Sequence, residues 1–321
     1  MRILQTVKKV PGGIMIVPLL MGALVNTFTP WIWTYFNGTF TTYLWKAGAM
    51  PILAAFLFCN GVTIDFKQAG TTLTKGVVLT TTKVVTGMLI GIALSFAFGE
   101  AGIWGITPLA VIAAVANSNG GLYAALAGEF GDATDVGAVS ILSINDGPFF
   151  TLLALGAAGY KVPIATLIGC VIPIVIGCIL GNLDKDIRKF CEPGATLLIP
   201  FFAFPLGAGL TLTSIVKAGP AGVLLGVAST VITGLVGYFI YKLMKSKSPE
   251  VGAAIGTTAG NAASTPAAVA AAGVISTAVS DAATVQVSAA IITTAILCPI
   301  LVTMLHNREM KLHPERNLQS E

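Results

Sequence analysis

Apolar blocks of about 20 residues, the length of a helix that crosses roughly 30 Å of membrane hydrocarbon, follow one another along nearly the whole of this 321-residue chain. Only 10% of the residues are charged, whereas a soluble domain carries about a quarter. A soluble fold would need a polar face on most helices, and these blocks do not provide one. The sequence therefore predicts an all-α polytopic membrane protein embedded in the lipid bilayer.

Turn and charge signals divide the apolar sequence into ten expected transmembrane spans. These spans lie near residues 12–28, 45–63, 76–98, 107–128, 135–158, 162–182, 195–213, 221–243, 252–272 and 284–305. The N-terminal stretch has the basic start of a signal peptide but lacks a small-x-small cleavage site. We therefore expect it to be retained as the first span.

Basic residues are distributed unevenly between the two sides of this ten-span arrangement. Of the 18 Lys and Arg residues, 14 fall on the side of both termini, and only Lys46, Lys161 and Lys217 fall on the other. Lys and Arg are concentrated in the cytoplasmic loops of membrane proteins. We therefore expect a multi-pass protein of the bacterial cell (inner) membrane with both termini in the cytoplasm. The net charge of +4 comes from these loops and does not indicate nucleic-acid binding.

The two halves of the chain repeat one another. The matching segments are 17–26 with 172–182, 61–70 with 209–219, and 76–91 with 222–237. Three matches in the same order, at nearly constant offset, predict two five-span repeats, residues 1–160 and residues 161–321 with a cytoplasmic C-terminal tail. Because five is an odd number, the second repeat must enter the membrane from the opposite side. This is the inverted-repeat plan of secondary transporters.

The fourth and ninth spans each carry a polar, helix-breaking segment at their centre. The site residues expected there are Asn117, Ser118, Asn119, Gly120 and Gly121 in the fourth span, and Asn261, Ser264 and Thr265 in the ninth. Asparagines, paired glycines and the following proline weaken a helix interior. Unwound backbone at this depth faces a cavity or protein, and a new helix N-terminus attracts anions.

Paired breaks in inverted repeats predict a substrate site where the two breaks meet near the midplane. The alternative is that these polar side chains only form interhelical hydrogen bonds that hold the bundle together.

Two ionisable residues lie inside apolar spans. Asp146 follows Ser143 and Asn145 and precedes a Gly147-Pro148 kink in the fifth span. A carboxylate at that depth costs about 3 kcal/mol or more and marks an ion or proton pathway, so Asp146 is a candidate proton carrier. The alternative is a structural pair with Lys83 of the third span.

Lys83 has three possible roles: it snorkels to the membrane surface, pairs with Asp146, or binds a substrate carboxylate. We expect solvated or capping roles for the carboxylates at span ends, namely Asp65, Asp132, Asp135 and Asp281. His306 and His313 follow the last span and carry no motif.

The segments VKKVPGGIMIVPLLMGALVNT, FCNGVTIDFKQAG, AVANSNGGLYAAL and SINDGPFFTLLALG together resemble the bacterial 2-keto-3-deoxygluconate permease family, over essentially the full length. The resemblance implies uptake of 2-keto-3-deoxygluconate, an anionic sugar acid from pectin breakdown, by proton symport. It implies no cofactor.

That family is in turn distantly similar to the bile acid:sodium symporters, in which ten spans form a panel and a core with crossing fourth and ninth helices. The similarity implies a panel of spans one, two, six and seven and a core of the other six. In those relatives sodium is bound by the fourth-helix break, by hydroxyls of the fifth helix and by a glutamate at the ninth break. Here Asn117, Ser118 and Asn119 fit the first role and Ser140 or Ser143 the second, but the ninth break has Asn261 and no glutamate. Sodium coupling is therefore the alternative to proton coupling, and Lys83 would supply a fixed positive charge in place of the cation.

Two other function classes fit the sequence less well. An intramembrane enzyme needs a nucleophile with a base, paired aspartates or a zinc motif within the spans, and the sequence has none. The five cysteines form no CxxC pair, so we expect neither a metal site nor disulfides. A channel would fit the polarity but not the paired, inverted breaks.

Overall fold

The computed structural model describes residues 2–9, 13–64, 70–145 and 147–312. Within these ranges the chain forms helices and short connections, and no strand occurs among them. Five helices of the described part are long and apolar enough to cross a membrane, or seven if each of two bent helix pairs counts as one span. The architecture is that of a multi-pass helical membrane protein.

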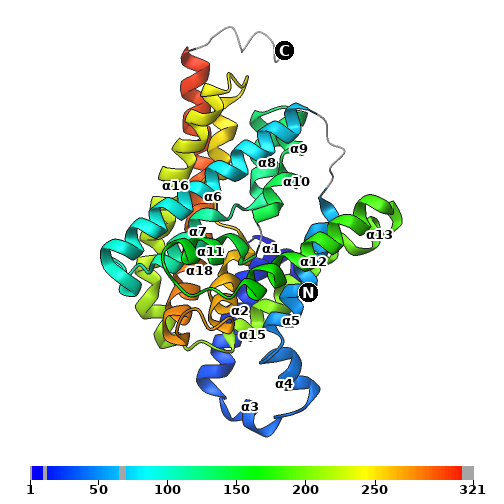
Figure 1. The fold of residues 1–321 in the computed structure, drawn as a ribbon, viewed down its shortest axis with the longest axis vertical. Coiled ribbons are helices and arrows are strands. Elements are labelled where there is room, and N and C mark those ends of the chain that lie inside the picture. Colours follow the sequence, from blue (N-terminus) through cyan, green and yellow to red (C-terminus); the bar gives the residue numbers. More distant parts are fainter. Residues whose placement is uncertain (1, 10–12, 65–69, 146, 313–321) are drawn as a thin grey trace.

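One group of helices packs mainly on itself and forms the lower right part of the molecule in Figure 1. This first helix group consists of α2 (Gly13–Phe28), α5 (Ala49–Thr63), α12 (Ile164–Leu183) and α15 (Ile199–Gly207). Its two main contacts are α2 with α15 and α5 with α12. Both pair a helix from the first half of the chain with one from the second half.

Glycines allow the helices of this group to approach closely. A Cβ atom on Gly22 would lie 2.1 Å from the carbonyl oxygen of Phe204, and one on Gly207 would lie 1.8 Å from the carbonyl oxygen of Leu19. No side chain fits at either position, so the backbones of α2 and α15 touch directly. Small residues serve this purpose in membrane bundles because lipid provides no hydrophobic force between helices.

A second helix group contains the longest helices, two of which run side by side in Figure 1. It consists of α6 (Thr71–Phe98), α7 (Pro108–Ala116), α16 (Leu212–Leu243), the 3₁₀ segment η3 (Pro249–Ile255) and α18 (Thr277–Leu312). The helices α16 and α18 contain 32 and 36 residues, or about 48 and 54 Å at 1.5 Å per residue. Both therefore extend well beyond the hydrocarbon layer, further than the sequence predicts.

Shorter elements connect or flank these groups. They are α1 (Ile3–Lys9), α3 (Trp31–Tyr35), α4 (Phe40–Trp45), η1 (Gly99–Ala101), α8 (Gly120–Phe130), α9 (Ala133–Gly137), α10 (Val139–Leu142), η2 (Ser143–Asn145), α11 (Phe149–Ala157), α13 (Lys185–Cys191), α14 (Gly194–Leu197), η4 (Gly260–Ser264) and α17 (Thr265–Ala271). The helices α3 and α4 occupy a segment expected to be a loop. Their exposed aromatic side chains, among them Phe40 and Tyr35, suit a membrane interface.

The fifth predicted span is interrupted rather than kinked. It is divided into α9, α10, η2 and α11, and Gly147 has a φ of +86°. A positive φ cannot continue an α-helix, and the following Pro148 lacks the N–H that would continue the hydrogen bonding of the preceding turns. Because the fourth, fifth and ninth predicted spans are all divided, each piece is shorter than a membrane-crossing helix.

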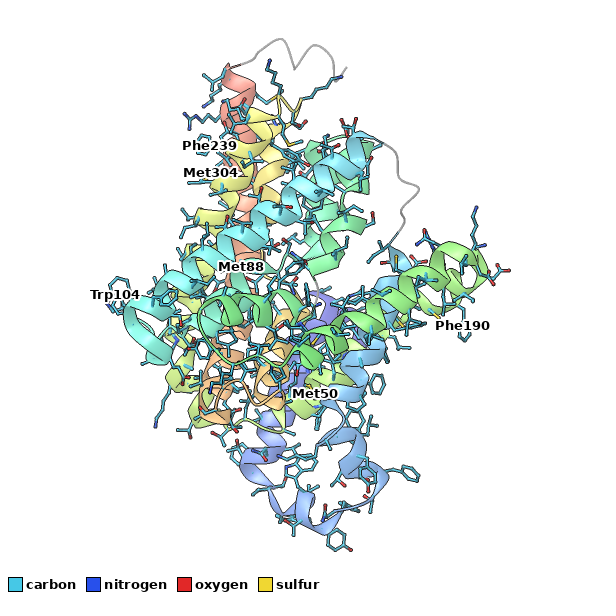
Figure 2. The ribbon with its side chains drawn as sticks, in the orientation of Figure 1. Met50, Met88, Trp104, Phe190, Phe239 and Met304 are labelled. Atoms are coloured by element: carbon cyan, nitrogen blue, oxygen red, sulfur yellow. The ribbon has the colours of Figure 1, made fainter. Side chains whose placement is uncertain are left out.

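Large apolar side chains cover the outside of the molecule (Figure 2). Phe239 of α16 and Met304 of α18 project outward, with 56% and 65% of their surface exposed. Exposed large apolar side chains on these long helices suit a surface that faces lipid, whereas a soluble monomer exposes few large apolar patches.

Candidate functional site

The polar segment of the fourth predicted span breaks the helix as expected. Helix α7 ends at Ala116, α8 begins at Gly120, and the two axes are bent by 42°. Asn119 has extended backbone angles, and its side-chain oxygen accepts a hydrogen bond from the N–H of Leu122 at 3.0 Å. Asn119 is therefore an N-cap, which explains why the second half of the span restarts there.

The ninth predicted span contains no long helix at its centre. It consists of η3, an extended connection and η4, and then α17, which has a proline in its first turn. Since 3₁₀ segments leave hydrogen-bonding groups less well paired than an α-helix does, this stretch depends on neighbouring helices for partners. All of η3 is buried.

The two breaks lie against each other and are joined by hydrogen bonds. The Asn117 amide donates to the Asn261 side chain at 3.4 Å, and the Asn119 N–H donates to the Thr257 hydroxyl at 3.0 Å. The Thr258 hydroxyl donates to the carbonyl oxygen of Ala114 at 3.0 Å. Polar groups of one break thus replace the helical partners missing in the other.

A cavity of about 650 Å³ lies beside these breaks, between the first helix group and the elements α8, α10 and η4. Its wall includes Ser118, Asn119, Gly120 and Gly121 from the first break, and Gly260 and Asn261 from the second. The opposite wall comes from α1, α2, α5 and the segment from α13 to α15. Cavities of roughly 300–1,000 Å³ are typical of small-molecule sites.

One wall of the cavity suits an anion. Gly120 and Gly121 form the first turn of α8 and line the cavity. The first N–H groups of a helix have no intrahelical partner and carry partial positive charge. The neighbouring Ser118 is 4% exposed, and its hydroxyl has no hydrogen-bond partner within the described residues. A carboxylate or hydroxyl group in the cavity would provide a hydrogen-bond partner for these N–H groups and for the Ser118 hydroxyl.

Three of the predicted site residues lie behind the wall of this cavity rather than in it. Asn117 is 4% exposed and supports Asn261. The Ser264 hydroxyl donates to the carbonyl oxygen of Asn261 at 2.6 Å, and Thr265 is 1% exposed. Asn117 and Ser264 therefore support Asn261 of the cavity wall instead of lining the cavity themselves.

Lys83 is completely buried, which excludes snorkelling to the membrane surface from the three roles considered for it. Its ammonium group donates to the carbonyl oxygen of Thr257 at 2.7 Å and lies 3.2 Å from the Thr233 hydroxyl of α16. Lys83 is not part of the cavity wall. Lys83 thus binds a backbone carbonyl oxygen at the point where the ninth predicted span is interrupted.

The predicted coupling residues of the fifth span are only partly described. Asp146 and the Ser143 side chain lie outside the described part of the chain. Asn145 is 2% exposed, and its amide donates to the carbonyl oxygen of Ala116 at 2.9 Å. Asn145 thus caps the C-terminal end of α7, at the first break.

At the span ends, the capping role predicted for Asp132 and Asp135 is confirmed, and the description of His306 needs correction. Asp132 and Asp135 form a capping box at the start of α9, as expected, but Asp135 is 1% exposed and pairs with Lys75 at 2.7 Å. His306, expected to lie in a featureless tail, is on α18 and lies 2.9 Å from the buried carboxylate of Glu250. Asp65 and His313 fall outside the described residues.

Five polar residues of the cavity wall were missed by the sequence analysis, one of which is Thr196 of α14. Lys8 and Glu192 belong to the exposed ends of the opposite wall, and Asn60 and Thr63 belong to α5. Asn60 stands within an apolar block, in FCNGVT. A polar residue in that setting is a signal that could have identified it.

Comparison with known proteins agrees with the resemblance seen in the sequence motifs. The model of a family described as 2-keto-3-deoxygluconate permease matches residues 4–311. The chain is 47% identical to 2-keto-3-deoxygluconate permease 1 of Salmonella typhimurium, over 97% of this chain and 98% of that protein. It is 38% identical to the 2-keto-3-deoxygluconate permease of Escherichia coli K12, over 97% of this chain and 96% of the relative.

Proposed function

Because the chain belongs to the 2-keto-3-deoxygluconate permease family, we propose that it imports 2-keto-3-deoxygluconate across the bacterial inner membrane by proton symport. Family membership makes it a transporter and not an enzyme. The substrate is a small anion, so movement alone into the cell would work against the inside-negative potential by about 2.3 kcal/mol per charge per 100 mV. When one proton moves with each substrate anion, no net charge crosses the membrane, and the potential no longer opposes uptake.

The observation that carries the proposal is the cavity formed by the two helix breaks. It combines the first turn of α8, the buried Ser118 hydroxyl and the Asn119 and Asn261 side chains. The positive end of α8 suits the substrate carboxylate, and the amides and hydroxyls suit its hydroxyl groups. Binding between broken helices is also how other secondary transporters hold their substrates.

Ten spans in two inverted repeats, residues 1–160 and 161–321, remain our proposed topology. The close contacts of the first helix group support it. Gly22 of α2 approaches α15, and Gly177 of α12 approaches α5, where its Cβ atom would lie 2.1 Å from the carbonyl oxygen of Phe58. Gly22 and Gly177 occupy the same position in the matching segments 17–26 and 172–182. The first helix group would be the panel and the second the core.

The cavity opens, in our proposal, toward the cytoplasm. Its wall includes Lys8 and Glu192, which lie in segments that the distribution of basic residues assigns to the cytoplasmic side. Both termini would then be cytoplasmic, and the described conformation would face inward. Rocking of the core against the panel would expose the same wall to the other side.

Uptake by purified protein in liposomes tests the proposal. We expect labelled 2-keto-3-deoxygluconate to accumulate under an inward proton gradient and to exchange without one. Accumulation that requires a sodium gradient instead would support the sodium-coupled alternative. No exchange of the labelled sugar acid under any gradient would reject the substrate. The sequence-based candidate for the proton carrier stays Asp146, for which Asp146→Asn should retain exchange and lose accumulation.

A further inference from the structure

The connection between η3 and η4, residues 256–259, lies outside any helix and is held in place by other elements. Its buried backbone groups need partners from elsewhere. The carbonyl oxygen of Thr257 accepts a hydrogen bond from Lys83 of α6 at 2.7 Å. The N–H of Thr258 donates to the Thr294 hydroxyl of α18 at 3.0 Å. Because these two backbone groups belong to one planar peptide unit, the contacts from α6 and α18 together fix its orientation.

The side chain of Thr257 connects this fixed peptide to the cavity wall. Its hydroxyl accepts a hydrogen bond from the N–H of Asn119 at 3.0 Å. The side-chain oxygen of Asn119 accepts from Leu122, whereas its side-chain NH2 group has no hydrogen-bond partner among the described residues. Since Asn119 lines the cavity, this NH2 group can donate to an oxygen atom of a bound molecule. Its direction depends on the Asn119 backbone and therefore on Thr257.

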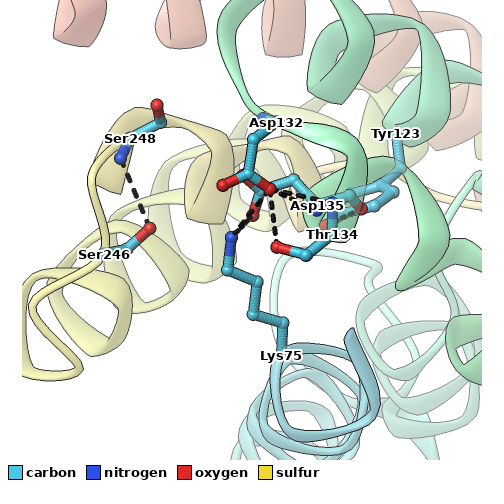
Figure 3. A network of polar contacts seen from close by, with 7 residues as sticks. All are labelled: Lys75, Tyr123, Asp132, Thr134, Asp135, Ser246 and Ser248. Atoms are coloured by element: carbon cyan, nitrogen blue, oxygen red, sulfur yellow. Dashed lines mark hydrogen bonds and ion pairs between the residues drawn. The ribbon is translucent and has the colours of Figure 1, made fainter. Parts of the chain in front are cut away.

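Lys83 differs from the other buried lysine of α6. Lys75 lies 2.7 Å from the carboxylate of Asp135 (Figure 3). Lys83, about two turns further along the helix, forms no ion pair with any carboxylate in the described part of the chain. Its hydrogen-bond partners are the Thr257 carbonyl oxygen and, at 3.2 Å, the Thr233 hydroxyl.

Binding a carbonyl oxygen does not by itself explain why a lysine is buried here. Burying a charge is costly, and a neutral side chain could donate the same hydrogen bond. A charged donor forms a shorter and stronger hydrogen bond than a neutral one. Such a bond suits a backbone segment that must keep one position without helical partners. Ionisable residues within the membrane, moreover, are characteristic of functional sites.

We propose that Lys83 is a positioning residue for the substrate: by holding the peptide between Thr257 and Thr258, it fixes the Thr257 hydroxyl and thereby the orientation in which Asn119 binds the sugar acid. This inference rests on the proposed function, in which Asn119 contacts the substrate. Lys83 and Thr257 are not part of the cavity wall. Both therefore act on substrate affinity through Asn119 and not by touching the substrate.

Two buried threonines that contact Lys83 provide a matched pair of variants. Thr257→Val removes the hydroxyl that binds Asn119 but keeps the carbonyl oxygen that binds Lys83. Thr233→Val removes the other partner of Lys83, a hydroxyl that also donates to the carbonyl oxygen of Ser229 at 2.7 Å. Each variant loses one hydroxyl at a site that is 0% exposed. A difference in substrate affinity between them thus isolates the connection to Asn119.

The test measures the dissociation constant of 2-keto-3-deoxygluconate by calorimetry on the purified full-length protein in detergent, together with the melting temperature. We expect Lys83→Met and Thr257→Val each to weaken binding by about tenfold or more, the effect of one lost polar contact. Thr233→Val should stay within about twofold of the wild type. The double variant Lys83→Met/Thr257→Val should bind about as weakly as the weaker single variant, because substitutions along one chain of contacts are not additive.

A purely structural role for Lys83 would lower the melting temperature and the fraction of protein that binds, but would leave the dissociation constant of the folded protein unchanged. That result for Lys83→Met would overturn the inference. Wild-type affinity of Thr257→Val would contradict it even if Lys83→Met does not fold, because Thr257→Val leaves both contacts of Lys83 in place. Equal weakening by Thr233→Val would indicate general loosening of the bundle and would also reject it. If the wild type itself does not bind the sugar acid, the proposed function fails, and the inference fails with it.

Discussion

At the scale of single residues, the most informative position is Asn119, which both caps α8 and lines the cavity. Its backbone N–H also donates to Thr257 of the other break. Side-chain and main-chain groups of one residue thus shape the site, start a helix and join the two halves of the chain.

Replacing Asn119 should separate its roles in folding and in transport. Loss of an N-cap costs about 1 kcal/mol, which is small against a total stability of roughly 5–15 kcal/mol. We therefore expect Asn119→Leu to reach the membrane in near wild-type amounts while uptake falls by at least about tenfold, the effect of one lost polar contact. Asn119→Ser, which retains a cap, is the control for stability. Equal losses of expression and uptake in Asn119→Leu would instead indicate a packing role.

Asp132 should make the protein sensitive to acid. Its pKa is lowered from 3.8 to about 2 in the folded state, because hydrogen bonds and the Lys75 charge outweigh partial burial. A depressed pKa stabilises the fold above the unfolded value, and the contribution is lost as the pH falls through the folded value. In detergent, the melting temperature of the wild type should exceed that of Asp132→Asn at neutral pH. The difference should close between pH 3.8 and 2, and a difference that does not change with pH would contradict the assignment.

The amino-acid sequence predicted the positions of functional groups more reliably than it predicted their contacts. The run 117–121 was correctly predicted to break its span because glycine and asparagine weaken helices locally. The role of Lys83 stayed open in the sequence analysis because hydropathy gives the depth of a residue but not its partner. The carbonyl oxygen that Lys83 binds belongs to Thr257, 174 residues away, and is available only because the ninth span is interrupted.

At the scale of elements, backbone contact between α2 and α15 determines the geometry of the first helix group. A methyl group on Gly207 would lie 1.8 Å from the Leu19 carbonyl oxygen. Since no flexible side chain can move aside, the helices themselves must separate. The cavity wall contributed by α2 would move with them.

Gly207→Ala should therefore destabilise the protein in spite of alanine's higher helix propensity. Overpacking of this kind costs about 1–3 kcal/mol, which should appear as a lower melting temperature in detergent and weaker substrate binding. Gly169→Ala in α12 is the control, since nothing lies within 4 Å of a Cβ atom there. We expect that control to be neutral or slightly stabilising. A Gly207→Ala protein as stable as the wild type would show that α2 and α15 are not in direct contact.

Element boundaries were predictable where long apolar helices run uninterrupted, and less so elsewhere. The α12 helix, Ile164–Leu183, agrees with the expected span 162–182. The fifth span was expected to be one helix with a kink at Gly147-Pro148, but it is divided there because Gly147 adopts a left-handed backbone. Apolar composition is equally compatible with one long helix and with several short segments buried in a bundle. Only the packing of α9 and α10 on α6 decides between them.

At the scale of the whole molecule, the proposed inverted topology places the loops on opposite sides of the membrane. Trp104, before α7, and Phe190, on α13, are 80% and 86% exposed and lie at opposite edges of Figure 2. In a variant that lacks the five free cysteines, a membrane-impermeant maleimide should label Trp104→Cys in intact cells. Phe190→Cys should be labelled only after lysis. Labelling of both from outside would reject the ten-span arrangement.

The hydrogen bonds between the two breaks also bear on protein engineering. Asn117 and Asn261 are 144 positions apart in sequence yet form one polar unit, so substitutions in one will have effects that depend on the other. Chimaeras of two homologous permeases that are joined near residue 160 would separate these partners and combine breaks that never evolved together. Changing the sugar acid that is accepted will therefore require libraries that vary both segments at once, or grafts that transfer both from a single parent.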